Sequence, residues 1–239
     1  MSRLTHFSNV ADQGEFIAVY PDGVGSFWAD GRGVTDADDS GIDDVGFLMA
    51  LMDAIGAQVR IDPTRVFVTG ISNGGFMAQR LACERADRFA AIASVGATVP
   101  ERLPSRCRQA RAVSALFING TDDPLIPYAG GVATGRSGRS AALLSAPAST
   151  ARWAELCGCS TPPTEADLPG GTTDGTRVVR TAYTGGRDGA EVVLVTVAGG
   201  GHTWPGGIQY APARMIGRTS RAIDASRYIW EFFAAHARS

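Results

Sequence analysis

Three polar residues of this chain have the types that a single hydrolytic site requires: a nucleophile, a base and an acid. Ser72 stands in GISNG at residues 70–74, which is a G-x-S-x-G pattern. A serine hydroxyl attacks a carbonyl carbon when a base accepts its proton, and histidine suits that task because its pKa lies near neutrality. The chain contains 3 His, and His202 stands in GGGHTWPGG at residues 199–207. These residues predict acyl transfer through a serine nucleophile.

The neighbours of Ser72 make the short pattern informative, because G-x-S-x-G also arises by chance in a chain with 30 Gly. RVFVT at residues 65–69 has the composition of a buried strand, and apolar residues return at helical spacing from Phe76 to Leu81. A strand, a tight turn and a helix would lift the hydroxyl out of the sheet and aim helix N–H groups at developing negative charge. In the alternative interpretation, Ser72 only caps the helix.

His202 is the base that the sequence favours. It follows a predicted strand at residues 192–197, and parallel α/β sheets carry their chemistry beyond the carboxyl ends of their strands. His6 and His236 lie near the two ends of the chain. The alternative is that His202 is a loop residue without a catalytic role.

The acid must hold the imidazole in the right tautomer and stabilise the imidazolium. Asp122 and Asp123 follow a predicted strand at residues 114–120 and precede Pro124. Residue type alone fits both carboxylates. In the alternative interpretation, the two aspartates only form a turn before the proline.

Short β-branched runs alternate with helical patterns along the chain, which predicts an α/β fold with a mostly parallel sheet and helices on both faces. The expected strands are 16–20, 66–69, 90–95, 115–118, 177–183 and 192–197. The expected helices are 43–58, 73–84, 141–156 and 222–235.

The composition fits a single domain over residues 1–239, because 239 residues with 44% hydrophobic side chains suffice for one core. A net charge of −2 with no basic stripe gives no basis for nucleic-acid binding. The chain contains no run of about 18 apolar residues, which a membrane span would require. The N-terminal residues lack the apolar segment of a signal peptide. Oligomeric state is not readable from the pattern.

The cysteines and acidic residues predict neither a metal nor a cofactor. Cys83 and Cys107 form a disulfide in one interpretation and are buried free thiols in the other. Residues 36–41 resemble the start of a calcium loop, but the twelfth position would be Phe47, where a bidentate glutamate is needed. An acidic loop that caps the next helix explains this stretch better.

Several segments resemble the polyhydroxybutyrate depolymerase and feruloyl esterase family of secreted bacterial esterases, from about Leu4 to the C-terminus. They are FIAVYPDG, FWADGR, DDVGFLMALMD, VFVTGISNGGFMAQRLACE, NGTDDPLIPYAGG and GGGHTWPGG. The resemblance implies the α/β-hydrolase fold and a serine carboxylesterase that forms an acyl-enzyme. It also implies a small or polymeric ester substrate with feruloyl, acetyl or short hydroxyalkanoate groups, and an extracellular or periplasmic location.

The resemblance also implies roles for particular residues. The nucleophile would be Ser72, the base His202 and the acid Asp123, since Asp123 directly precedes the proline. The backbone N–H of Asn73 would donate to the oxyanion. Trp204 would line the substrate pocket, and Trp28 is a second, weaker pocket candidate.

The chain departs from the family pattern in three places, one of which is Asn119, where the family commonly has His. The family opens with a strand that ends in His-Gly and a glycine-rich loop with a second oxyanion donor, and this chain resembles the family only after that strand. The resemblance therefore predicts an N-terminally shortened domain with a gap in the sheet between residues 16–20 and 66–69. This gap favours the alternative function, a catalytically impaired scaffold or fragment that acts as a binding module. A cysteine that the family often has near residues 183–191 is also absent, which leaves Cys159 without its usual partner.

Overall fold

A computed structural model describes residues 1–103, 105, 107, 111–135, 138–160, 162–168 and 174–238. The main sheet has six strands in the order β1-β2-β3-β8-β7-β6. The first four of these strands run parallel, whereas β7 and β6 continue the sheet in antiparallel pairs. Their bounds are β1 Phe67–Ile71, β2 Ala91–Val95, β3 Ser114–Gly120, β8 Val192–Ala198, β7 Arg177–Tyr183 and β6 Thr164–Leu168.

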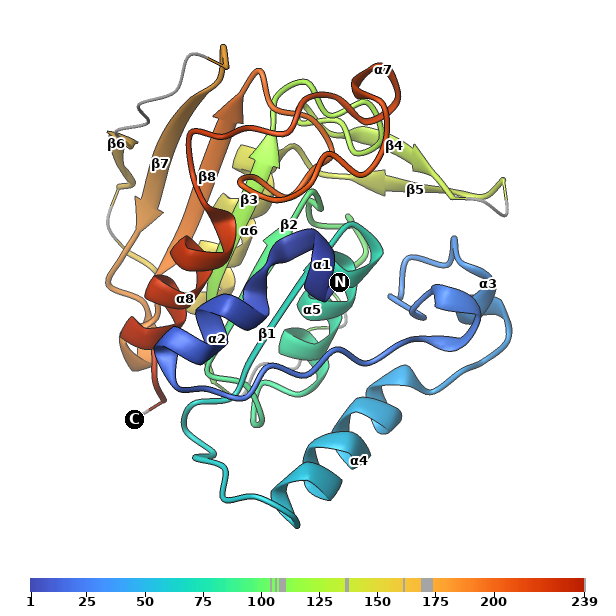
Figure 1. Cartoon of the computed structure of the whole chain (residues 1–239), viewed down its shortest axis with the longest axis vertical. Coiled ribbons are helices and arrows are strands. Elements are labelled where there is room, and N and C mark those ends of the chain that lie inside the picture. The colour runs from blue at the N-terminus through green and yellow to red at the C-terminus, as the bar shows by residue number, and fades with distance from the viewer. Residues whose placement is uncertain are drawn as a thin grey trace.

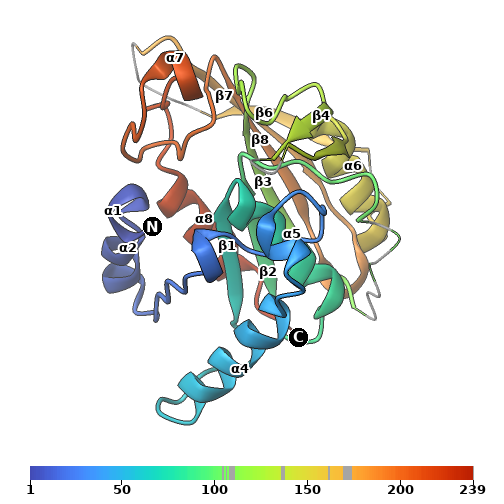
Figure 2. The same cartoon turned by 90° about the vertical axis from the view of Figure 1, so that its right-hand side faces the viewer.

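Helices cover both faces of this sheet (Figures 1 and 2). On one face, α2 and α8 pack over the apolar side chains of β2, β3, β7 and β8. On the other face, α5 and α6 enclose a second core with β2, β3 and β8. The helices are α1 Ser2–Thr5, α2 Phe7–Gly14, α3 Asp36–Asp39, α4 Asp44–Gly56, α5 Asn73–Glu84, α6 Ala146–Cys157, α7 Ala213–Ile216 and α8 Ala225–Ala235. The fold is the predicted α/β arrangement with a mostly parallel sheet.

Two of the expected elements are wrong. Residues 16–20 are extended but belong to no strand; Phe16 packs against Trp230 in the core, whereas Ile17 and Val19 are exposed. The expected helix at 141–156 begins only at Ala146, because residues 140–143 form strand β5 (Ser140–Leu143), which pairs with β4 (Gly131–Thr134). This hairpin reaches over toward α3, where Arg139 forms an ion pair with Asp39.

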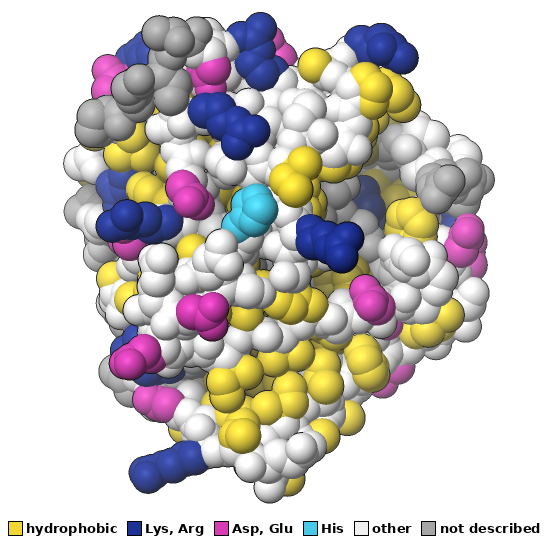
Figure 3. All heavy atoms as spheres, in the orientation of Figure 1, with side chains coloured by type: hydrophobic (Ala, Val, Ile, Leu, Met, Phe, Trp, Pro, Cys, Tyr) yellow, Lys and Arg dark blue, Asp and Glu magenta, His cyan; other side chains and the backbone are white. Residues whose placement is uncertain are grey.

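Strand β1 is the end strand of the described sheet. Beside it, Ile17, Val19 and Tyr20 of the extended segment and Phe47 of α4 are exposed, as is Val59 just after α4. Figure 3 shows apolar side chains gathered over this part of the surface. We call these five side chains the apolar edge. Helix α4 packs against α5 through the buried side chains of Val45 and Met49.

The C-terminal end of α8 is tied to the start of β8. Glu191 accepts hydrogen bonds from Arg180 and from Nε2 of His236, the latter at 3.2 Å. The contact with His236, and after it that with Arg180, holds the pKa of Glu191 below its usual value despite partial burial.

A disulfide joins Cys83 of α5 to Cys107. Of the two interpretations of these cysteines, the structure therefore has the disulfide.

Candidate active site

Ser72 lies at the sharp turn between β1 and α5. Its backbone has φ 55° and ψ −121°, a sparsely populated conformation for a residue with a side chain, and such strain is typical of a nucleophile held out of a sheet. The turn depends on glycine: a Cβ at Gly70 would lie 2.5 Å from the backbone carbon of Gly74. Ser72 is partly exposed, and its hydroxyl forms no hydrogen bond with the described residues.

His202 and Asp123 form a buried pair at the carboxyl ends of β8 and β3. Nδ1 of His202 lies 2.7 Å from Oδ2 of Asp123, and both side chains are almost fully excluded from solvent. The other carboxylate oxygen of Asp123 accepts hydrogen bonds from the backbone N–H groups of Leu125 and Ile126, each at 2.8 Å. These bonds fix the position of the carboxylate, which can in turn orient the imidazole and stabilise its protonated form.

Asp122 occupies a different place. Its side chain is exposed and accepts a hydrogen bond from the hydroxyl of Thr121 at 2.8 Å. Of the two aspartates that residue type left open, Asp123 is the one that faces His202.

Gly96 brings the histidine and the nucleophile to one location. The backbone N–H of Ser72 donates to the carbonyl of Val95 at 2.8 Å, so the turn after β1 lies beside the end of β2. The next residue, Gly96, has φ 55°, and a Cβ there would lie 3.2 Å from Nδ1 of His202 and 3.7 Å from the side chain of Ile71. The imidazole therefore lies over Gly96, next to the turn that carries Ser72.

Tyr210 fixes the histidine loop from outside, and sequence reasoning missed it because a lone tyrosine in a loop carries no pattern. Its hydroxyl donates to the backbone carbonyl of His202 at 2.8 Å. Burial, and to a smaller extent the charge of Asp123, raise the pKa of Tyr210. The phenol therefore keeps the proton that it donates to the loop.

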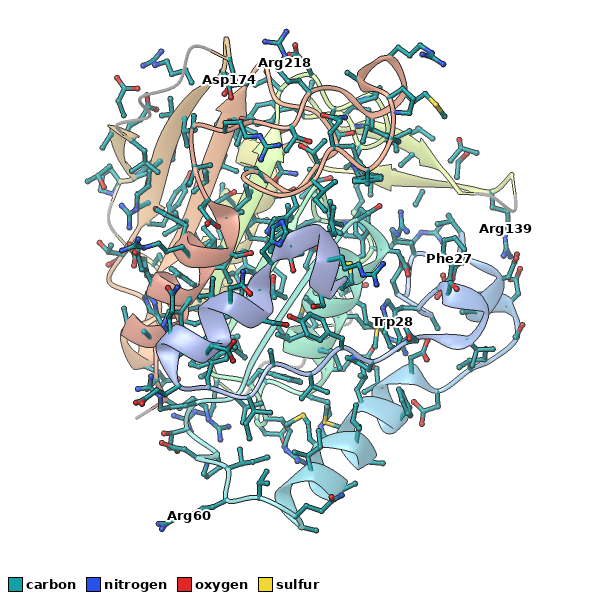
Figure 4. The ribbon with its side chains drawn as sticks, in the orientation of Figure 1. Phe27, Trp28, Arg60, Arg139, Asp174 and Arg218 are labelled. Atoms are coloured by element: carbon teal, nitrogen blue, oxygen red, sulfur yellow. A yellow bond between two sulfur atoms is a disulfide. The ribbon has the colours of Figure 1, made fainter. Side chains whose placement is uncertain are left out.

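The two predicted pocket tryptophans lie in different surroundings. Trp204 is 1% exposed, packs in the core under α8 and donates from its indole N–H to Ser226 at 3.0 Å, a position that does not fit a pocket wall. Trp28 (Figure 4) is half-buried on the segment that faces α5, and its backbone N–H and carbonyl form hydrogen bonds with the side chain of Asn73. Among the described residues, no group of three or more His, Cys, Asp or Glu is placed to hold a metal ion.

No helix in the described part of the chain is long and apolar enough to span a membrane.

The free thiols of Cys157 and Cys159 lie in the core beside α6. Burial raises the pKa of Cys157 to about 12, so this thiol is not a nucleophile near neutral pH. The candidate site among the described residues therefore consists of Ser72, His202 and Asp123 with the surrounding backbone.

Comparisons with known proteins place the chain among hydrolases. A family model described as prolyl oligopeptidase family matches residues 4–103. The chain is 34% identical to "Putative esterase NocK" of Nocardia uniformis subsp. tsuyamanensis over 95% of its own length and 67% of that protein's. It is 30% identical to "Probable feruloyl esterase C" of Aspergillus niger, over 93% of the chain and 66% of the relative.

Solved structures give a weaker likeness. One described as "Crystal Structure of a Thermostable Esterase" shares 16% identity with a TM-score of 0.36, over 48% of this chain and 26% of that one. The chain spans about two thirds of the length of NocK and of the Aspergillus niger esterase. On its fold and its likeness to NocK, the chain belongs to the esterases of the α/β-hydrolase class.

Proposed function

We propose that this protein is a serine carboxylesterase that hydrolyses carboxylic esters through an acyl-enzyme. The observation that carries the proposal is the buried pair of His202 and Asp123, with Nδ1 and Oδ2 at 2.7 Å, next to the strained turn of Ser72. A nucleophile, a base and an orienting acid at the carboxyl ends of β1, β8 and β3 of one parallel sheet match the requirements of acyl transfer.

In the proposed mechanism each group has one step. His202 accepts the proton of the Ser72 hydroxyl as its oxygen attacks the ester carbonyl carbon, while Asp123 stays ionised and stabilises the imidazolium. The backbone N–H of Asn73, at the start of α5, donates to the oxyanion. The imidazolium then gives its proton to the departing alcohol, and a water molecule, activated by the same base, releases the acid from Ser72.

We further propose feruloyl, acetyl or short hydroxyalkanoate esters as substrates, either small molecules or polymers. This choice is supported by relatives named feruloyl esterase and by the family resemblance of the motifs. The disulfide between Cys83 and Cys107 supports an extracellular or periplasmic location, because disulfides persist in oxidising compartments.

One experiment tests the mechanism. The protein should hydrolyse 4-nitrophenyl butyrate, and a fluorophosphonate should label Ser72 once per chain. Ser72→Ala should abolish labelling and lower kcat by roughly 10⁴-fold or more, whereas the exposed Ser40→Ala should keep both. Full labelling of Ser72→Ala would show that the nucleophile is another residue. Labelling of the wild type without turnover would instead favour the impaired scaffold.

A peptidase is the second candidate, because the family model that matches residues 4–103 is named for prolyl oligopeptidases. That match includes Ser72 but ends before Asp123 and His202. Cleavage of a prolyl 4-nitroanilide faster than of 4-nitrophenyl butyrate would favour the peptidase over the esterase.

A further inference from the structure

The side chain of Asn73 reaches away from the nucleophile and pairs with the backbone of Trp28. Its Oδ1 accepts from the N–H of Trp28 at 2.7 Å, and its Nδ2 donates to the carbonyl of the same residue at 3.0 Å. The amide thus pairs with this peptide segment as a neighbouring strand would. The residue directly after Ser72 therefore ties the segment around Trp28 to the first turn of α5.

A buried ion pair completes this attachment. Nδ2 of Asn73 also donates to Oδ2 of Asp30 at 2.6 Å, and Arg32 binds the same carboxylate through two of its nitrogens. The Asp30 side chain is 0% exposed and that of Arg32 is 8% exposed. The guanidinium of Arg32 lies 3.8 Å from the ring centre of Phe76 in α5. We call the side chains of Asn73, Asp30 and Arg32 the clamp.

The clamp is a costly way to fasten a loop. Removing two charges from water costs several kcal/mol per ion, and a buried ion pair is weak evidence for added stability. Such a pair does fix one arrangement of the groups around it, because any other arrangement leaves a buried charge without its partner. Here the ion pair fixes the position of segment 27–32 relative to Ser72.

The same segment is anchored from behind. The N–H of Ala29 donates to the buried carboxylate of Asp44 at 2.6 Å, and Arg80 donates to the carbonyl of Ala29. Phe27 and Trp28 project from this segment above α4 (Figure 4), and the ring of Trp28 stacks on that of Phe47, with centroids 6.5 Å apart. The clamp thus holds an aromatic segment against the residue that follows the nucleophile.

We propose that the clamp is a positioning device that sets acyl-group selectivity: it holds segment 27–32 as a wall beside Ser72, so that esters with large planar acyl groups bind against it. This inference rests on the proposed esterase function and assigns the wall to a specific segment. Asn73 acts through its side chain on the wall and through its backbone N–H on the oxyanion. Loss of the side chain should therefore change selectivity as well as rate.

The test compares 4-nitrophenyl ferulate with 4-nitrophenyl acetate. In Asn73→Ala and Asp30→Ala, the ratio of kcat/KM for ferulate to kcat/KM for acetate should fall about 10-fold, with most of the fall in KM for ferulate. Asn73→Asp should be worse than Asn73→Ala, because its carboxylate faces that of Asp30. The double variant Asn73→Asp, Asp30→Asn should recover part of the ratio, because it restores their hydrogen bond with donor and acceptor exchanged.

The control is Ser145→Ala, which removes the N-cap of α6, away from segment 27–32, and should lower stability by about 1 kcal/mol while the ratio stays the same. Amide exchange at Trp28 should accelerate in the clamp variants but not in the control. Faster exchange with an unchanged ratio would show that the clamp only supports the fold, and would overturn the inference. If the wild type hydrolyses neither ester, the proposed function itself fails, and this inference fails with it.

Discussion

Gly96 offers a sharp test of the site geometry, because a single methyl group placed there would touch the imidazole of His202. In Gly96→Ala, the new Cβ would lie 3.2 Å from Nδ1 and 3.3 Å from Cε1 of His202. These contacts are tighter than ordinary van der Waals contact, so a neighbour must move by a few tenths of an ångström. His202 is buried and held by Asp123 at 2.7 Å, so the imidazole can shift but cannot rotate away.

Two effects of this substitution can be separated by size. At φ 55°, an alanine costs roughly 1–2 kcal/mol, which should lower Tm by roughly 2–8 °C in a chain of this length. A misplacement of about 1 Å in an active site can cost 10²-fold in rate, so a shift of a few tenths should lower kcat roughly 3- to 10-fold.

Gly41→Ala is the matched control. Gly41 has φ 64°, and a Cβ there meets no atom within 4 Å, so this variant carries the same backbone strain without the contact. Both variants should melt lower by similar amounts, and only Gly96→Ala should lose kcat on 4-nitrophenyl butyrate. Equal kcat in the two variants would refute the placement of His202 over Gly96 in the working enzyme.

Three further predictions concern the acid, a charged contact and the disulfide. Asp123→Asn should lower kcat by roughly 10⁴-fold while the fold is kept, and Asp122→Asn should be mild; the reverse order in a kcat comparison would show that the wrong aspartate was chosen. Because the folded-state pKa of Glu191 is lowered below its usual 4.5, its stabilisation is complete above that value and is lost as pH falls through the lowered pKa. Urea unfolding should therefore find Glu191→Gln less stable than the wild type at pH 7, by no more than about 1 kcal/mol because solvent screens this partly exposed carboxylate, and the difference should shrink below about pH 4; a constant difference would contradict the contact with His236. Cys83→Ala should cost about 3 kcal/mol of stability by opening a loop with a sequence separation of 24, and an unchanged melt after reduction of the wild type would argue against that contribution.

Elements with a strong local pattern were predictable from the sequence. Helix α5 and strand β7 have the bounds that the pattern gave, because both combine regular apolar spacing with clear ends. The stretch at residues 140–143 was misread because alanine and leucine favour helix, whereas pairing with β4 decides the observed strand. Residues 16–20 were misread for a related reason. A segment with a β-type composition forms a strand only where another strand pairs with it.

The candidate site shows a similar division. Ser72 and His202 follow from motif and order along the chain, and the structure faces His202 with Asp123. Trp204 was expected at the pocket because it lies two residues after His202, whereas the structure places its indole in the core. The clamp could not be read at all, since Asp30 and Asn73 are 43 residues apart and meet only in the folded chain.

The apolar edge should make the protein prone to self-association in solution. The outer side of β1 presents backbone donors and acceptors next to exposed Ile17, Val19 and Phe47, and such strand edges are templates for pairing between molecules. At the concentrations used for purification, the chain should self-associate through this side, and light scattering should grow with concentration. A lysine placed at Val19 should suppress that growth, since charged residues on strand edges oppose sheet-to-sheet pairing. Handling of the protein, from its yield to its shelf life, thus depends on a surface that has no part in the proposed acyl transfer.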